Sequence, residues 1–402
     1  MTVASKNNIK NEKNSKGKGS NTAATRTDKE IQDKFKVCYE RMNDGLIERS
    51  EEIKICLTSL IAGEHPLLIG PPGTAKSLLI DSLMKWISSG KKFSALMGKF
   101  TTPEELFGTV DLVKLTHDRI YTRNTTGQLP EADLAFLDEI FLSSSAVLNT
   151  LLKVLNERTW RNTCGTEIKV PLLMCLAAGN HFPSAQELGA LYDRFLFRKK
   201  VKPIESVAGR QKLLFSGSSH GVEFEPDEQI TRDEIISARK VSRKLPWTDS
   251  ARIGFLEIWK QINIAGIRIG DRRMFKTKNA IQAFAFMNGR SQVELKDLTI
   301  SQHSLWEDPQ EQPEKVAKII RSIADPNNGM VDEFRNALND LRTKVKTGDP
   351  SAGFDSYKKS EALKRSLEKF IRESEDDDVI KECKLILQEV DPLVKEYAGK
   401  FM

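Results

Sequence analysis

The sequence is poor in cysteine, and its cysteines follow no pattern. Five cysteines are scattered over 402 residues, and no two of them form a Cys-x-x-Cys pair. This distribution argues against a disulfide framework and against a zinc site, and it fits a reducing cytoplasm. The chain also lacks any apolar run near the roughly 18 residues of a membrane span, and its N-terminus has no apolar signal-peptide core. We therefore expect a cytoplasmic protein without a membrane span.

A strong excess of charge of one sign is also missing. Lysine and arginine number 62 against 56 aspartates and glutamates, which leaves a formal net charge of +6. This charge is too small for a chain of this length to indicate nucleic-acid binding on its own. Hydrophobic residues make up 39% of the chain and charged residues 29%, so the composition predicts a folded protein of two or three domains.

Four regions differ in pattern along the chain. Residues 1–28 contain almost nothing apolar, which predicts a disordered basic tail, with a nucleic-acid-binding arm as the alternative. Residues 29–204 alternate helices with short apolar strands, as in an α/β domain with a mainly parallel sheet. Residues 205–309 predict a small all-helical domain, and residues 310–402 predict two or three further helices.

A phosphate-binding loop is the most informative motif. An apolar strand at Leu67–Ile69 leads into a Gly/Pro loop, and a helical pattern begins at Lys76-Ser77. We expect Lys76 to reach the β- and γ-phosphates and the Ser77 hydroxyl to hold Mg²⁺. Ala75 stands where glycine is usual, and we interpret the loop as a variant because alanine can adopt a helical conformation there. The predicted nucleotide-binding residues of this segment are Gly70, Pro71, Pro72, Gly73, Thr74, Ala75, Lys76, Ser77 and Leu78.

Two further apolar strands end in polar side chains. The strand from Leu134 ends in Asp138, which would orient the Mg²⁺ shell, and Glu139, which would polarise the attacking water as a general base. An acidic helix start is the alternative for this pair. A second strand ends in Asn180, which can hydrogen-bond both the lytic water and a γ-phosphate oxygen. Asparagine after a strand is commonly a turn residue, but its place as third in this series favours function.

Arginines follow in two places. Arg194 lies in the segment Leu191–Phe195, where its guanidinium could project to the γ-phosphate of a neighbouring subunit and stabilise the transition state. A surface ion pair is the alternative. Arg272 and Arg273 open a helix in the all-helical region, and one of them could reach back across the cleft to the nucleotide. We favour Arg273, and a plain surface charge cluster is the alternative for the pair.

Together these motifs resemble AAA+ ATPases of the helix-2-insert group, and within it the MoxR family, with the RavA-like branch the most similar. The resemblance covers about residues 35–310. Its motifs are Gly-Pro-Pro-Gly-Thr-Ala-Lys-Ser at 70–77, Leu-Asp-Glu at 137–139, Ala-Gly-Asn at 178–180, Asp-Arg-Phe at 193–195 and Asp-Arg-Arg at 271–273, with the segments 293–298 and 305–309. The Ala75 variant is usual in that branch.

The resemblance implies a fold and a set of roles. The fold would be a three-layer αβα sandwich of the P-loop NTPase class with a parallel sheet, followed by an all-α lid. The implied roles are Walker A for Lys76 and Ser77, Walker B for Asp138 and Glu139, sensor 1 for Asn180, arginine finger for Arg194 and sensor 2 for Arg273. The resemblance also implies ATP and Mg²⁺ as ligands and a hexameric ring with the nucleotide between subunits.

Two insertions of that group match alternating patterns. Residues 112–122 alternate around Thr116-His117-Asp118, which predicts a hairpin, and residues 159–170 alternate around Thr163-Cys164-Gly165. In the family such hairpins face the ring pore, and His117 is a candidate substrate contact. The helices beyond about residue 310 match no module of the branch, which has a helical and β module there.

Two functions remain open at this point. The first is an ATP-driven chaperone that remodels a protein complex, often with a von Willebrand A (vWA) domain partner, as the resemblance implies. The second is a nucleic-acid translocase or restriction-type motor of the same broad group, which would need a basic, aromatic-rich pore or an added nucleic-acid module. A ring that binds nucleotide mainly as an assembly switch is a third alternative.

Overall fold

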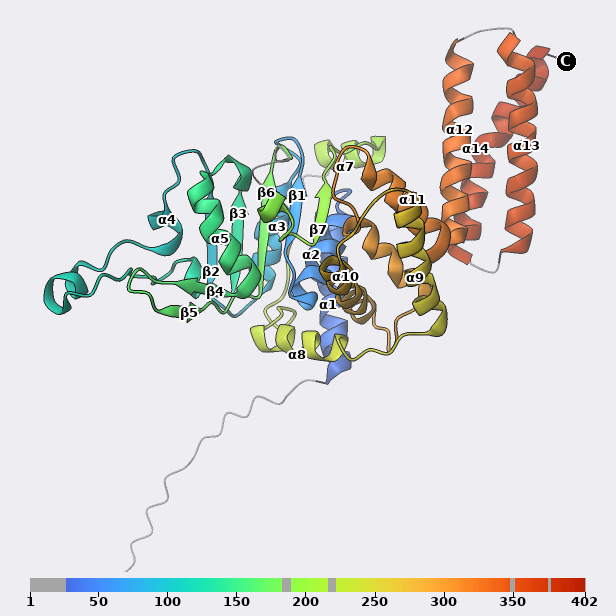
Figure 1. Cartoon of the computed structure of the whole chain (residues 1–402). Coiled ribbons are helices and arrows are strands. Elements are labelled where there is room, and N and C mark those ends of the chain that lie inside the picture. Colours follow the sequence, from blue (N-terminus) through green and yellow to red (C-terminus); the bar gives the residue numbers. More distant parts are fainter. Residues whose placement is uncertain (1–26, 183–188, 216–221, 348–350, 375–376, 402) are drawn as a thin grey trace, which may run out of the picture.

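The computed structural model describes residues 27–401 apart from 183–188, 216–221, 348–350 and 375–376. The predicted tail at 1–28 therefore lies, except for its last two residues, outside the described residues. The described chain forms three bodies in sequence, which are a sheet domain, an all-helical body and a C-terminal helical bundle (Figure 1).

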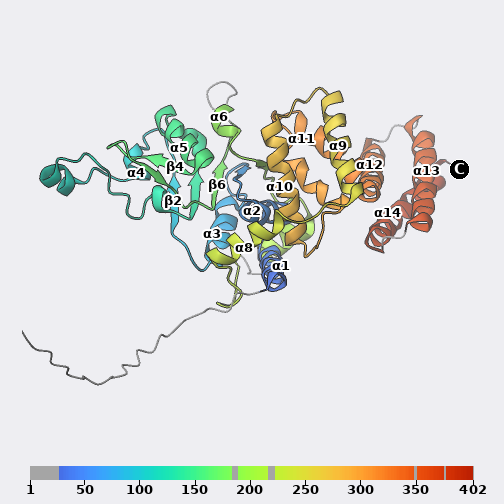
Figure 2. The ribbon, with the colours of Figure 1, turned by 60° about the horizontal axis from the view of Figure 1, so that its bottom comes forward.

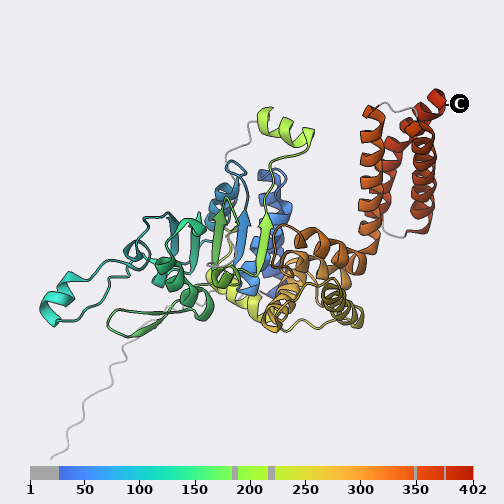
Figure 3. The ribbon, with the colours of Figure 1, turned by 45° about the horizontal axis from the view of Figure 1, so that its top comes forward.

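The sheet domain is built on five parallel strands. Their order is β2-β3-β6-β1-β7. Strand β1 therefore lies between β6 and β7 (Figure 3). The strands are β1 Pro66–Ile69, β2 Lys92–Leu96, β3 Leu134–Asp138, β6 Met174–Gly179 and β7 Phe197–Lys200. Because the strands are parallel, the ends of β1, β3 and β6 lie at one edge, where the predicted site residues follow them.

Successive side chains of the inner strands β1, β3 and β6 enter two different cores. In β1, Leu68 belongs to one apolar cluster, whereas Leu67 and Ile69 belong to the other. Helices α1 Asp28–Gly45, α2 Ser50–Ala62 and α3 Lys76–Trp86 supply the first cluster, and α5 Ser145–Glu157 supplies the second. The sheet is thus covered by helices on both faces, which explains why its central strands are almost wholly apolar.

The all-helical body follows the sheet domain without a break in the core. Its elements are α8 Arg232–Ser242, α9 Asp249–Ile264, α10 Asp271–Met287, the 3₁₀ segment η4 Leu295–His303 and α11 Gln312–Ala324. Their buried side chains belong to the same apolar cluster as those of α1 and α2. In the ribbon, α8 and α10 lie beside α2 (Figure 2). The α/β fold class with an all-helical lid and C-terminal helices is confirmed.

The C-terminal helices form a separate bundle. Helices α12 Pro326–Thr347, α13 Ser351–Glu373 and α14 Asp377–Phe401 pack around their own core, which runs from Val331 to Val390. The bundle projects away from the lid in Figure 1. No helix among the described residues is long and apolar enough to cross a membrane.

The two predicted insertions differ in outcome. The hairpin at 159–170 is confirmed, with β4 Thr159–Arg161 antiparallel to β5 Glu167–Lys169. The hairpin at 112–122 is wrong, because a helical turn with the π-helix η1 Lys114–Asp118 occupies it. Asp111 Oδ1 accepts the Lys114 backbone N–H, and a left-handed residue ends the turn, so local capping overrides the alternation.

The remaining described elements connect these bodies. Short α4 Pro103–Phe107 precedes the first insertion, and the 3₁₀ turns η2 Leu129–Glu131 and η3 Ile140–Leu142 flank β3. Helix α6 Gly189–Tyr192 precedes β7, and α7 Val207–Phe215 follows it.

Candidate nucleotide site

The phosphate loop joins β1 to α3 with a left-handed residue at the helix start. Ala75 is the N-cap of α3 and has φ 61° and ψ 24°. Gly73 also has a positive φ, of 77°. The left-handed conformation explains why glycine is usual at position 75, since a Cβ costs roughly 1–2 kcal/mol there. Alanine tolerates the conformation at that cost, and the first N–H groups of α3 keep no intrahelical partner, which suits them to phosphate oxygens.

A chain of hydrogen bonds links the phosphate loop to the ends of β3 and β6. Lys76 Nζ donates to Asn180 Oδ1 at 3.2 Å and to the Gly70 carbonyl at 2.6 Å. Asn180 in turn donates from Nδ2 and from its backbone N–H to the Glu139 carboxylate. Burial lowers the pKa of Lys76, and the charges of Glu139 and Asp138 oppose that shift. A lysine, an amide and a carboxylate therefore meet at one point.

A second pair lies beside this chain. Ser77 Oγ donates to Asp138 Oδ2 at 3.1 Å, and Asp138 Oδ1 accepts the Glu139 backbone N–H at 3.0 Å. A hydroxyl next to a carboxylate is the oxygen donor set that suits Mg²⁺, which binds proteins through few ligands and keeps several waters. The residues present therefore fit a magnesium–nucleotide complex.

A cavity of about 310 Å³ opens at this edge of the sheet. Of the predicted residues, Gly70 and Pro71 stay outside its lining and instead accept hydrogen bonds from Lys76. The lining consists of Pro72, Gly73, Thr74, Ala75, Lys76, Ser77, Leu78, Asp138, Glu139 and Asn180. Ten residues predicted from separate segments thus surround one space.

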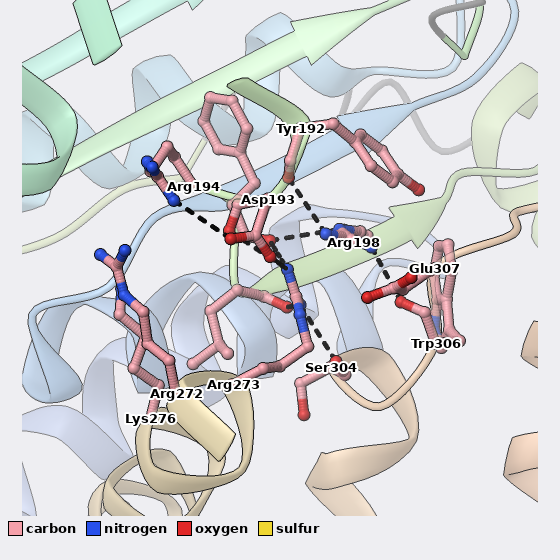
Figure 4. Close-up of polar contacts among 12 residues, drawn as sticks. Tyr192, Asp193, Arg194, Arg198, Arg272, Arg273, Lys276, Ser304, Trp306 and Glu307 are labelled. Carbon is pink, nitrogen blue, oxygen red and sulfur yellow. Dashed lines mark hydrogen bonds and ion pairs between the residues drawn. The ribbon is translucent and has the colours of Figure 1, made fainter. Parts of the chain in front are cut away.

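The predicted arginines lie elsewhere, and none of the three lines this cavity. Arg194 forms an ion pair with Asp193 at 3.1 Å. Arg273 is buried and binds Asp193 Oδ1 at 2.9 Å (Figure 4). Arg272 is exposed and contacts the Asn156 side chain. The structure thus groups the arginines with one another on the lid side of the sheet.

Sequence reasoning missed the residues that hold these segments in place. Buried Arg49 donates to the Thr74 carbonyl at 3.1 Å and to the Lys202 carbonyl at 2.9 Å, so it fixes the phosphate loop. Arg198 is buried within β7. Neither arginine had a signal in the sequence, because their partners are backbone carbonyls, which every residue has.

The chain is similar to known proteins along most of its length. A family model described as the MoxR domain in the MoxR-vWA-beta-propeller ternary systems matches residues 33–241, and an AAA lid domain model matches residues 256–320. Two uncharacterized proteins of Methanocaldococcus jannaschii are similar. MJ0079 is 41% identical over 69% of this chain and 72% of its own length, and MJ0812 is 37% identical over 76% and 80%.

A solved structure shares the fold. It is the crystal structure of a protein from Cytophaga hutchinsonii that is provisionally described as an ATPase. The TM-score is 0.57 at 18% identity, and the match covers 74% of this chain and 94% of that one. At this identity the likeness concerns the fold alone.

Proposed function

The chain belongs to the MoxR family of AAA+ ATPases, and from this we propose that it hydrolyses Mg²⁺-bound ATP in a hexameric ring to remodel a partner protein complex. The matching family is described by its ternary systems with vWA and beta-propeller proteins. A vWA-domain protein is therefore the partner that we propose for this chain.

The hydrogen bonds that link Lys76, Asn180 and Glu139 are the observation that supports hydrolysis most. These three residues come from the ends of three adjacent elements and share one cavity. Lys76 would bind the phosphates, and Glu139, held by Asn180, would accept a proton from the attacking water. Ser77 and Asp138 are the residues that would hold Mg²⁺, which supplies neutralisation of the phosphate charge when bound.

The projecting insertion favours a protein substrate over a nucleic acid. Its exposed apolar side chains include Leu112 and Val113, each 68% exposed, and Ile120 and Tyr121. Nucleic-acid channels combine a basic groove with stacked aromatic side chains. These four residues form the apolar tip of the insertion, and only Tyr121 among them is aromatic. The apolar tip instead matches the exposed apolar segments of a protein partner.

Within the family, we propose the RavA-like branch on the loop motif with Ala75. The C-terminal bundle α12–α14 is helical in all its described residues, and so it differs from the helical and β module of that branch. The branch assignment therefore rests on the motifs alone, and the partner-binding role of the bundle is not part of the proposal.

Replacing the proposed base should trap the substrate. We expect Glu139→Gln to bind ATP normally but to lower turnover by about 10²- to 10⁴-fold, the usual contribution of general base catalysis. Steady-state phosphate release and nucleotide retention on a desalting column measure the two effects. Glu157→Gln, at the exposed end of α5, is the matched control. Normal turnover in the Glu139→Gln protein would show that another group is the base.

Subunit mixing tests the ring. Arg194→Ala should bind ATP but not hydrolyse it, and Lys76→Ala should neither bind nor hydrolyse it. In mixed rings the intact Arg194 of a Lys76→Ala subunit would face the intact pocket of an Arg194→Ala subunit, so some turnover should return. If mixtures at several ratios stay inactive although they co-assemble, Arg194 does not act across the interface.

A further inference from the structure

The loop that contains Arg194 is held from one side by a buried arginine of β7. Arg198 is 1% exposed and stacks on the Tyr192 ring, with 3.8 Å between its guanidinium carbon and the ring centroid. It donates to the carbonyls of Tyr192 at 3.1 Å and Phe195 at 3.2 Å, and to the carbonyl of Trp306 beyond η4 at 2.8 Å. Arg198 therefore fixes both ends of the loop to the lid.

A second buried arginine holds the same loop from the lid helix. Arg273, in the first turn of α10, is 4% exposed. Its Nη1 donates to the carbonyls of Leu196 at 3.0 Å and Ser304 at 3.1 Å, and its Nη2 donates to the Asp193 carbonyl at 3.2 Å. Both terminal nitrogens of Arg273 are thus bonded to the loop, so the position of the loop follows the position of α10.

One carboxylate connects Arg273 to Arg194. Asp193 Oδ1 accepts from Arg273 Nη2 at 2.9 Å, while Asp193 Oδ2 accepts from Arg194 Nη1 at 3.1 Å (Figure 4). Charge-assisted bonds to a guanidinium are directional as well as strong. The direction of Arg194 is therefore set by a carboxylate whose other oxygen is attached to the lid.

The contacts of Arg273 within its own subunit are with the loop and the lid. Arg273 does not line the nucleotide cavity of its own subunit, and its donors contact the loop and the end of η4. We propose that Asp193 is a positioning residue that ties Arg194 to lid helix α10, so that lid movement in one subunit moves the arginine presented to its neighbour. This inference rests on the proposed function of Arg194 across the interface.

Asp193→Asn is the sharpest variant for this proposal. The amide oxygen can still accept from Arg273, but the amide nitrogen is a donor and cannot accept from Arg194. We expect turnover to fall about tenfold, which corresponds to about 1.4 kcal/mol of lost transition-state stabilisation, while KM for ATP stays unchanged. Asp249→Asn, with a side chain 91% exposed at the start of α9, is the control and should leave both constants unchanged.

Mixed rings separate positioning from a structural defect. If Asp193 acts through Arg194, a Lys76→Ala subunit with an intact Asp193 should restore turnover in the pocket of an Asp193→Asn subunit. A folding defect in the Asp193→Asn subunit would damage its own pocket, which a neighbour cannot repair. Failure of this mixture to recover, or normal turnover of the Asp193→Asn protein alone, overturns the inference.

The same mixture tests Arg273 and keeps the two proposals distinct. Arg273→Lys keeps a cation but loses the paired contacts that Nη1 and Nη2 make with the loop. We expect turnover to fall in this variant and to return when Lys76→Ala subunits are mixed in. No return would mean that Arg273 serves the pocket of its own subunit, which contradicts the inference. Recovery in the Arg194→Ala mixture together with no recovery in the Asp193→Asn mixture removes the inference alone, whereas no recovery in either removes the proposed interface.

Discussion

At the scale of single residues, the site contains two residues with strained backbone conformations. Ala75 has φ 61° and Glu139 has φ 51°, both in the left-handed region that residues with a Cβ rarely adopt. Each such residue costs of order 1–3 kcal/mol and persists where its surroundings hold it. Asn180 holds Glu139 through two hydrogen bonds. The strain therefore lies at the two turns that face the cavity.

Relieving the strain at Ala75 should stabilise the protein. We expect Ala75→Gly to raise the free energy of unfolding by up to about 1 kcal/mol, because glycine adopts positive φ without steric cost. The urea midpoint without nucleotide measures the change. Gly73→Ala, at φ 77°, is the reciprocal control and should lower the midpoint. A lower midpoint for Ala75→Gly would show that the left-handed conformation is not the populated one.

At the scale of elements, the two insertions act as one projecting unit. Asn162 and Thr163, between β4 and β5, hydrogen-bond Thr122 and the Tyr121 carbonyl respectively. The hairpin thus supports the base of the helical turn η1, and both project from the same end of the sheet domain (Figure 1). A lone helical turn is unstable in water, so this contact explains how the apolar tip keeps its place.

The apolar tip should matter for the partner and not for folding. We expect Leu112→Ser with Val113→Ser to abolish binding of the proposed vWA-domain partner, while the free energy of unfolding from urea titration changes by less than about 0.5 kcal/mol. Leu385→Ser, 61% exposed in α14, is the control. Unchanged partner binding in the double variant, with loss of salt-dependent nucleic-acid binding in Arg119→Ser, would instead favour a translocase.

At the scale of the whole molecule, a buried histidine connects the layers of the sheet domain. His65 accepts the Cys175 backbone N–H of β6 at Nδ1, at 2.9 Å, and its Nε2 lies 3.1 Å from the Leu155 carbonyl of α5. Burial, with the nearby charge of Arg158, holds the pKa of His65 well below its usual range. Protonation at Nδ1 would also place an N–H against the Cys175 donor, so folded His65 is neutral.

The stability of the protein should therefore fall in mild acid. Below its ordinary pKa of about 6.5 the unfolded histidine binds a proton that the folded one does not, so stability is lost as pH falls. We expect a loss of about 1 kcal/mol from His65 between pH 7.0 and 5.5, and a smaller loss in His65→Gln. Urea titrations at both pH values measure it, with exposed His117→Gln as the control. An equal loss in His65→Gln would assign the effect to other groups.

The sequence by itself determined the α/β class and the residues that surround the cavity. Polar residues that directly follow apolar strands are a local signal, and parallel strands place their ends at one edge whatever the rest of the fold. The loop at 70–77, Asp138, Glu139 and Asn180 could therefore be identified without a structure. The helical turn at η1 could not, because its pattern suits two conformations and local capping chooses between them.

Only the tertiary structure decided which groups the arginines bind. Asp193 and Arg273 meet across 80 residues of sequence, and Arg198 binds the carbonyl of Trp306 across 108. Their other partners are mostly backbone carbonyls, which leave no side-chain signature in a sequence. Whether an arginine is exposed or buried depends on packing between domains, and so the tie between Arg194 and the lid became visible only in the folded chain.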